Sequence, residues 1–298
     1  MSRTNTSLLD YLKSWPLALL PHQLLSRAVR RATRWKAGWW KNFLINSFIR
    51  MFDVDMSEAD LPDAGDYPDF NSFFTRALKD DARPQPDDPG VIACPVDGRV
   101  SACGVLDEDR ILQAKGHEYS LATLLGGDSR RASPFLNGHF ATLYLSPRDY
   151  HRIHMPFTGR LLQTVYIPGR LYSVAPHTTR AIDGLFTRNE RLVSLFDTAA
   201  GPMAMVMVGA IFVSCMETVW EGVVNPRLGM SLQTRDYSLP GQSPLTLPRG
   251  SEMGRFNMGS TVILLFGPGK VSWSGSFGPD QAISIGQQIG HLDPGNPS

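Results

Sequence analysis

The sequence has 298 residues, of which 42% are hydrophobic, so it can form the core of one large domain or of two smaller ones. Its net charge of +1 hides an asymmetry, because residues 1–52 carry +8 and the remainder carries −7. No stretch reaches the roughly 20 apolar residues that span a bilayer. The three cysteines, Cys94, Cys103 and Cys215, have no metal-ligand spacing, which favours a reducing, cytosolic-side location over a disulfide scaffold.

Residues 1–52 are expected to form a basic, amphipathic, membrane-binding arm. Ser7 to Phe52 has the pattern of short helices that break near Pro16 and Pro21. Indole rings settle at headgroup depth while Lys and Arg meet anionic lipid. An ordinary helix pair packed on the body is the alternative. Nucleic acid is not the expected partner, because bulky aliphatic residues interleave with the basic ones. The arm holds four of the six tryptophans: Trp15, Trp35, Trp39 and Trp40.

The rest of the chain divides into a connecting segment and a β-rich body. Residues 53–90 are polar, acidic and rich in proline, and one short helix is expected at 70–78. From residue 91 onward, short alternating strands are separated by Gly and Pro turns. This pattern predicts a catalytic domain over 91–298 and an α+β chain with a mainly β, barrel-like or sandwich-like body. Strands are expected at 91–105 with a turn at Asp97-Gly98, and at 140–145, 161–167, 192–196, 205–216, 261–266 and 271–273.

The junction at Gly259-Ser260 is the candidate functional site. A polar segment ends there, and the apolar run 262–266 has the pattern of a buried strand. Glycine tolerates backbone angles that other residues resist. A serine that follows it can turn its hydroxyl back on the carbonyl of its own peptide bond. A glycine turn before a strand-capping serine is the plain structural alternative.

Asp97 and His154 are the candidate partners of Ser260. A serine hydroxyl is a poor nucleophile until a base takes its proton, and a carboxylate commonly orients the histidine that does so. Spacing alone does not select these residues, because Asp97 also fits a hairpin turn and His154 a hydrogen-bonded core histidine. His151 and His154 are three residues apart, but no third ligand has suitable spacing, so no metal is expected.

The chain resembles bacterial phosphatidylserine decarboxylase, the pyruvoyl-dependent prokaryotic type I family. The resemblance extends from the basic N-terminus to about Gln287. Met258 stands where the family usually has Leu in Leu-Gly-Ser-Thr, a nearly volume-conserving difference. The matching blocks are Cys94–Val100, Gln113–His117, Tyr144–Pro156, Phe196–Thr198, Glu217–Trp220, Met258–Thr261 and Gly267–Val271.

The resemblance implies that Asp97, His154 and Ser260 carry out self-cleavage between Gly259 and Ser260. Ser260 would attack the Gly259 carbonyl, and His154 would then take the α-proton of residue 260 so that β-elimination breaks the chain. Residues 1–259 and 260–298 would remain together as a heterodimer, with further dimerisation left open. Residue 260 would become a covalent pyruvoyl cofactor that forms a Schiff base with the substrate amine and accepts electrons as CO2 departs.

The resemblance further implies a lyase of phospholipid biosynthesis that is made as a zymogen. It would convert phosphatidylserine into phosphatidylethanolamine at the cytoplasmic face of the cell membrane, as a peripheral protein. His151 is implied at the substrate carboxylate or as a proton donor. His117 and Lys115 are weaker candidates for headgroup contacts, and an exposed loop pair explains them equally well.

Three other functions are weighed against this one. A Ser-His-Asp lipid hydrolase would be expected to have a Gly-x-Ser-x-Gly elbow, which the chain lacks. A non-enzymatic membrane-binding module explains the arm but not the Asp97, His154 and Ser260 blocks. A pyruvoyl decarboxylase of a soluble amino acid would not need a Trp- and Arg-rich arm.

Overall fold

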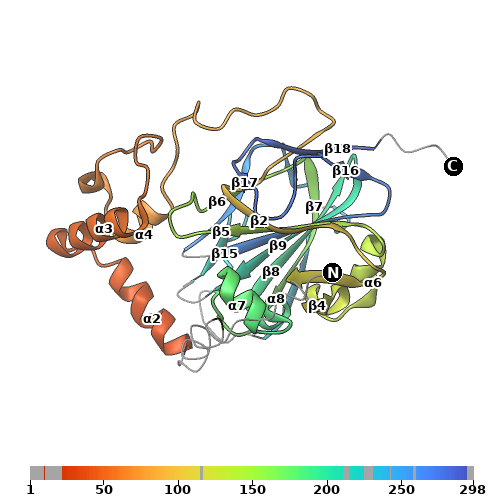
Figure 1. Ribbon diagram of the computed structural model, residues 1–298, viewed down its shortest axis with the longest axis horizontal. Coiled ribbons are helices and arrows are strands. Elements are labelled where there is room, and N and C mark those ends of the chain that lie inside the picture. The colour runs from red at the N-terminus through yellow and green to blue at the C-terminus, as the bar shows by residue number, and fades with distance from the viewer. Residues whose placement is uncertain are drawn as a thin grey trace.

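The computed structural model describes residue 10 and residues 22–114, 117–210, 215–224, 231–241, 243–257 and 260–293. A helical arm lies beside a body made mainly of strands (Figure 1). The expected α+β class with a mainly β body is confirmed. Among these residues, the structure contains no helix whose length and apolar character would let it cross a membrane.

A large antiparallel sheet forms the centre of the body. Its order is β12-β7-β8-β9-β15-β5-β2-β17, with β13 paired to β7. Strand β15 lies between β9 and β5 and is buried along its whole length. The strands are β2 (Gly98–Val105), β5 (His139–Leu145), β7 (Gly159–Ile167), β8 (Arg191–Thr198), β9 (Gly201–Gly209), β12 (Gln233–Asp236), β13 (Thr246–Leu247), β15 (Ser260–Phe266) and β17 (Ala282–Ile283).

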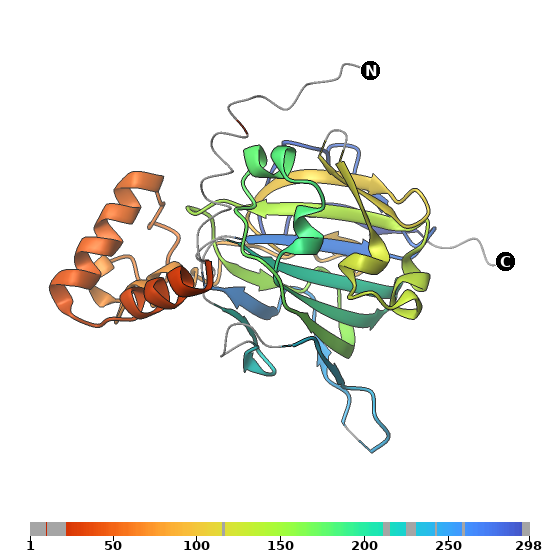
Figure 2. The same cartoon turned by 90° about the horizontal axis from the view of Figure 1, so that it is seen from below.

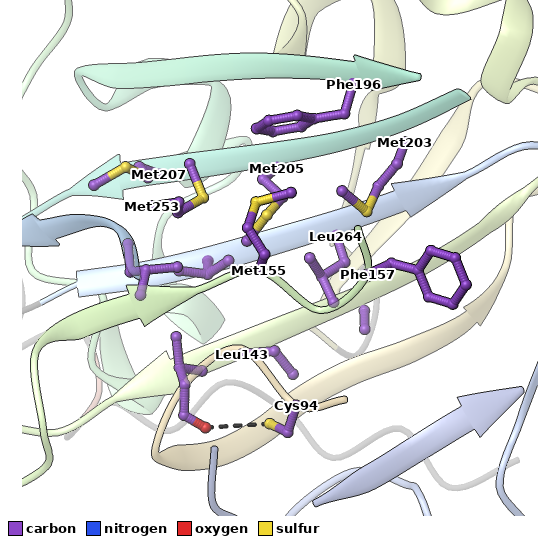
Figure 3. Close-up of a cluster of buried hydrophobic side chains, with 14 of the residues drawn as sticks. Cys94, Leu143, Met155, Phe157, Phe196, Met203, Met205, Met207, Met253 and Leu264 are labelled. Carbon is purple, nitrogen blue, oxygen red and sulfur yellow. Dashed lines mark hydrogen bonds between the residues drawn. The ribbon is translucent and has the colours of Figure 1, made fainter. Parts of the chain in front are cut away.

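Two smaller sheets cover one face of the large sheet. Alternate residues of β15, including Val262 and Leu264, share a core with Ile153, Met253 and Ile289 of the smaller sheets. Figure 3 shows methionine side chains gathered around Leu264 in this core. The packed layers support the sandwich-like expectation. The smaller sheets are β11 (Gly222–Val223), β10 (Met216–Thr218), β14 (Glu252–Phe256) and β6 (Arg152–His154), and β1 (Val91–Ala93), β18 (Gln288–Leu292) and β16 (Val271–Trp273).

Short helices and a hairpin cover the opposite face. Ile263 and Leu265 of β15 point to this side and join a second core. Successive strand residues face opposite sides of a sheet, so one strand supplies both cores. The covering elements are β3 (Arg110–Ala114), β4 (His117–Ser120), α5 (Leu121–Leu124), α6 (Ser129–Ala132), η2 (Ser133–Phe135), α7 (Pro176–Ala181) and α8 (Leu185–Arg188).

The arm contains helices α2 (His22–Thr33) and α3 (Gly38–Phe52), which project beside the body (Figure 2). Residues 53–90 hold η1 (Ala64–Asp66) and α4 (Phe70–Phe74). Ile45 of α3 packs with Phe73 and Phe74 of α4 in a third apolar cluster. The helix predicted at 70–78 is therefore present but ends at Phe74. The breaks expected at Pro16 and Pro21 lie outside the described residues.

The strand predictions are confirmed at 140–145, 161–167, 192–196, 261–266 and 271–273. The turn predicted at Asp97-Gly98 is wrong as a hairpin, because β1 pairs with β18 whereas β2 pairs with β5 and β17. Asp97 instead lies where the chain passes from one sheet to another. The single strand predicted at 205–216 is also wrong, because β9 ends at Gly209 and β10 begins at Met216.

Candidate active site

Ser260 is the first residue of the central strand β15. In the ladder it pairs with Leu145 of β5 and Gly209 of β9. The residue is fully buried, and its Oγ has no hydrogen-bond partner among the residues that the structure describes. A buried hydroxyl without a partner costs about 1–3 kcal/mol. Ser194 of strand β8 has the same property, so the missing partner does not by itself distinguish Ser260. The expected cleavage point includes Met258 and Gly259, which lie outside the described residues.

His154 at the end of β6 has the protonation state of a general base. Its Nδ1 lies 2.7 Å from the carbonyl oxygen of Gly250, which can only accept, so Nδ1 carries the proton. Burial lowers the pKa of His154, which keeps the ring neutral. The lone pair on Nε2 then accepts a hydrogen bond from the Tyr150 hydroxyl at 3.3 Å. The ring can therefore take up a proton at Nε2.

Asp97 lies next to the His154 strand but is bonded to other groups. Its carboxylate accepts hydrogen bonds from Arg83, at 3.0 Å from Nε and 2.6 Å from Nη2, and from the Ile285 backbone at 2.8 Å. The His154 backbone N–H donates to the Pro95 carbonyl, which holds the two segments together. The negative charge of Asp97 raises the pKa of His154, against the larger effect of burial. In the described part of the chain, no hydrogen bond joins Asp97 to His154 or His154 to Ser260.

His151 is a second neutral histidine close to the segment that leads to Ser260. Its Nδ1 lies 2.7 Å from the Asp149 carbonyl, and its buried Nε2 has no partner in the structure. Burial lowers the pKa of His151 to about 3. Its backbone carbonyl accepts from Phe256, at the end of β14. The structure therefore brings His151 and His154 together on one chain segment, with no third metal ligand among the residues described.

His117 belongs to a different part of the molecule. Its ring nitrogens lie 3.2 Å from Asp183 Oδ1 and 3.1 Å from the Arg180 carbonyl. These contacts tie strand β4 to the end of helix α7. Lys115 lies outside the described residues.

Sequence reasoning missed Arg83, Tyr150 and Arg76. Arg83 holds the Asp97 carboxylate, and these hydrogen bonds raise the pKa of the guanidinium. Tyr150 lies within the sequence block that contains His151 and His154. Its closeness to them in the sequence could therefore have marked it as a site residue. Arg76 and Arg83 stand in the polar connecting segment, where no periodic pattern marks them.

Comparisons with known proteins identify the family. A family model described as phosphatidylserine decarboxylase matches residues 70–291, and a second, described as PSD, matches residues 12–53. The phosphatidylserine decarboxylase proenzyme of Ectopseudomonas mendocina is 50% identical over 92% of this chain and 95% of its own length. The proenzyme of Alkalilimnicola ehrlichii is 55% identical over 88% of this chain and 92% of its own. That of Bordetella bronchiseptica is 53% identical over 86% of each chain. The chain belongs to the phosphatidylserine decarboxylase family.

Proposed function

We propose that this chain is a proenzyme that cleaves itself between Gly259 and Ser260 and then decarboxylates phosphatidylserine to phosphatidylethanolamine. The observation that carries the proposal is the fully buried, unpartnered Ser260 hydroxyl at the start of the central strand. The names of the relatives, which are all phosphatidylserine decarboxylase proenzymes, supply the substrate.

Self-cleavage uses groups of this chain alone. The Ser260 oxygen bonds to the Gly259 carbonyl carbon, and the peptide C–N bond breaks to give an ester. The hydroxyl proton passes through neutral His154 to the departing nitrogen. His154 then takes the α-proton of residue 260, and the ester oxygen leaves with the Gly259 carboxylate. Asp97 stabilises the protonated imidazole through its charge, since its carboxylate favours the charged form of His154.

Elimination would leave residue 260 as an N-terminal dehydroalanine. Its imine tautomer would be hydrolysed by water, with release of ammonia, to give the pyruvoyl ketone. The residues around Ser260 fit this group. The Ser260 oxygen has no competing partner, and the nearby His151 is neutral and buried. Once formed, the group supplies the ketone and the electron sink that decarboxylation requires. His151 orients the substrate carboxylate or returns a proton to the product through Nε2. His117 and Lys115 are assigned only a weaker role, at the headgroup.

Both chains remain associated after cleavage in this proposal. Residues 260–266 pair with β5 on one side and β9 on the other along the full strand. Residues 260–298 also supply β16, β17 and β18, which lie in two of the sheets. Separation would expose a fully buried strand to water, so a heterodimer of residues 1–259 and 260–298 is the expected mature form.

The arm is proposed to bind the cytoplasmic face of the cell membrane as a peripheral element. Trp35, Trp39 and Phe43 are exposed on it, with Trp39 68% accessible. Basic side chains close helix α2 at Arg30 and Arg31. Exposed aromatic rings beside cationic groups match the chemistry of a lipid interface. An enzyme held there takes the headgroup while the acyl chains stay in the bilayer.

A serine substitution tests the proposal. Ser260→Ala should leave one uncleaved chain and release no CO2 from phosphatidylserine above background. Ser284→Ala, which changes an exposed serine of the same small chain, should cleave and decarboxylate like the wild type. Gel analysis and CO2 release measure both outcomes. Undiminished decarboxylation by Ser260→Ala would refute the proposal.

A further inference from the structure

Arg76 is a buried arginine whose donors are mostly unused. The residue is 4% exposed and lies two positions after helix α4. Its Nη2 donates to the Arg148 carbonyl at 3.2 Å, and its guanidinium lies 5.6 Å from the centre of the Phe73 ring. Its Nε and Nη1 are buried and have no hydrogen-bond partner in the structure. Burial lowers the pKa of Arg76, although the charges of Asp97 and Asp149 favour its charged form. Neither carboxylate forms a hydrogen bond or ion pair with Arg76 in the described part of the chain, so a ligand that completes its contacts would explain the unused donors.

Arg76 lines a cavity of about 240 Å³. On the arm side, the lining includes Asp53, the residue that ends helix α3. On the other side it includes Tyr150, whose hydroxyl bonds to Nε2 of His154. The cavity therefore lies on a path from the lipid-facing arm to the proposed catalytic base.

The other arginines in the cavity already face carboxylates. Arg83 pairs with Asp97 at 2.6 Å and with Glu58 at 2.7 Å. Arg148 lies 4.0 Å from Asp149 and its side chain is largely exposed. None of the ion pairs among the described residues includes Arg76.

The acidic groups of the lining are Asp53, Asp55, Glu58 and Asp149, so the cavity is not simply a basic pocket. Glu58 is paired with Arg83, and Asp149 accepts from the backbone and the hydroxyl of Ser146. Asp55 accepts from the Ser57 backbone. A lining of mixed charge suits a zwitterionic ligand, in which an anionic group can pair with Arg76.

Arg76 also belongs to the surroundings of His151. Phe74, two residues earlier, packs against the His151 ring with 4.1 Å between centroids. The charge of Arg76 contributes to the lowered pKa of His151, which requires the two to be near each other. His151 Nε2 lacks a partner, as does Ser260 Oγ on the strand that follows Phe256 and the cleavage segment. Arg76, His151 and Ser260 thus each keep a buried polar atom that has no hydrogen-bond partner among the described residues.

We propose that Arg76 binds an anionic oxygen group of the substrate headgroup, either its phosphate or its carboxylate. The inference rests on the proposed function and adds a residue that recognises the substrate. The guanidinium presents planar N–H donors that match the oxygens of either group. In this proposal the headgroup enters the cavity that Arg76 lines, and its anionic group bonds to Arg76 donors that have no partner among the described residues.

Kinetics of Arg76→Gln test this assignment. The variant should still cleave itself, which shows that it folds, and its KM for phosphatidylserine in detergent micelles should rise about tenfold or more. Its kcat should change much less, because the lost contact holds the substrate before and during reaction alike. Arg76→Lys keeps the charge but not the planar fork. Its KM should lie between those of the wild type and Arg76→Gln. Arg130→Gln removes an exposed arginine as the matched control and should leave KM unchanged.

Competition by soluble headgroups separates the two anions. Glycerophosphoserine carries phosphate and carboxylate, whereas glycerophosphoethanolamine carries phosphate only. If Arg76 binds phosphate, Arg76→Gln should weaken inhibition by both compounds by a similar factor. If it binds carboxylate, only inhibition by glycerophosphoserine should weaken.

Two outcomes would overturn the inference. One is a self-cleaved Arg76→Gln with wild-type KM and wild-type inhibition by both compounds. The other outcome applies if Arg76→Gln does not fold. In that case, an Arg76→Lys variant with wild-type KM and wild-type inhibition would show that Arg76 does not bind the ligand. A wild-type protein that neither cleaves nor decarboxylates would instead refute the proposed function.

Discussion

Arg191 and Arg76 are both buried arginines, but they differ in how many of their N–H donors are hydrogen-bonded. Arg191 lies under the helices of the large sheet and is 2% exposed. Its guanidinium donates to four carbonyl oxygens at 2.7 to 2.9 Å, those of Thr123, Leu124, Thr187 and Asn189. Arg76, which is close enough to His151 for its charge to contribute to the lowered pKa of that histidine, donates to one carbonyl. Two of its nitrogens have no partner among the described residues.

We infer that a buried polar group with bonded donors stabilises the fold, whereas one with unused donors binds a ligand. Burial lowers the pKa of Arg191 to about 10, yet its donors are bonded, so it joins α5 to α8 and to Asn189, the residue after α8. Ser260 and His151 resemble Arg76, since each has a buried polar atom without a partner. Polar groups of a scaffold are normally satisfied. Arg76 and His151 are close to each other, because the charge of Arg76 contributes to the lowered pKa of His151.

Loss of the His154 base should have the largest effect. His154→Gln keeps a polar side chain but removes the imidazole that accepts the Ser260 proton. Self-cleavage should slow by about 100-fold or more. The fraction of cleaved chain after timed incubation of freshly purified precursor measures this. His291→Gln, on a strand of the three-stranded sheet, is the control and should cleave at the wild-type rate.

The two arginines should differ in their effect on stability. In a Ser260→Ala background, which keeps one chain, Arg191→Leu should lower the free energy of unfolding by about 3 kcal/mol, because it leaves buried carbonyls without donors. Arg76→Leu should change it by less than about 1 kcal/mol, because removing a poorly satisfied buried charge offsets the lost contacts. Urea denaturation measures both values. Equal losses would contradict the distinction drawn between the two regions.

His151 should make the fold sensitive to acid. Its folded pKa of about 3 lies below the unfolded value of about 6.5, so the unfolded state binds the proton more readily between these values. The His151 contribution to stability is present above about pH 6.5 and decreases as the pH falls toward 3. His151→Phe in the Ser260→Ala background should flatten this part of the stability profile, measured by urea denaturation from pH 7 to 4. If the free energy of unfolding of His151→Phe depends on pH as steeply as before, groups other than His151 cause the loss of stability in acid.

Much of the fold was predictable because local patterns determine it. Val262 to Phe266 form a continuous apolar run, and such a run becomes a central strand buried on both faces. The path around Asp97 was not predictable, because β1 pairs with β18, whose residues lie about two hundred positions along the chain. No local signal in a hairpin-like sequence reveals a partner so distant.

The site was predictable only in part. Ser260, His154 and Asp97 came from the family resemblance, since a serine, a histidine and an aspartate at these spacings are not distinctive. The Arg83 contact with Asp97 depends on tertiary structure, as do the unused donors of Arg76 among the described residues. Satisfaction of a buried charge is a property of the folded surroundings, and the residue type alone does not reveal it.

The intact mass of purified wild-type protein tests the central claim most directly. We expect two chains, with masses that correspond to residues 1–259 and 260–298, and a small chain whose first residue is blocked. The same preparation should release CO2 from phosphatidylserine. A single unbroken polypeptide that nevertheless decarboxylates phosphatidylserine would contradict the account.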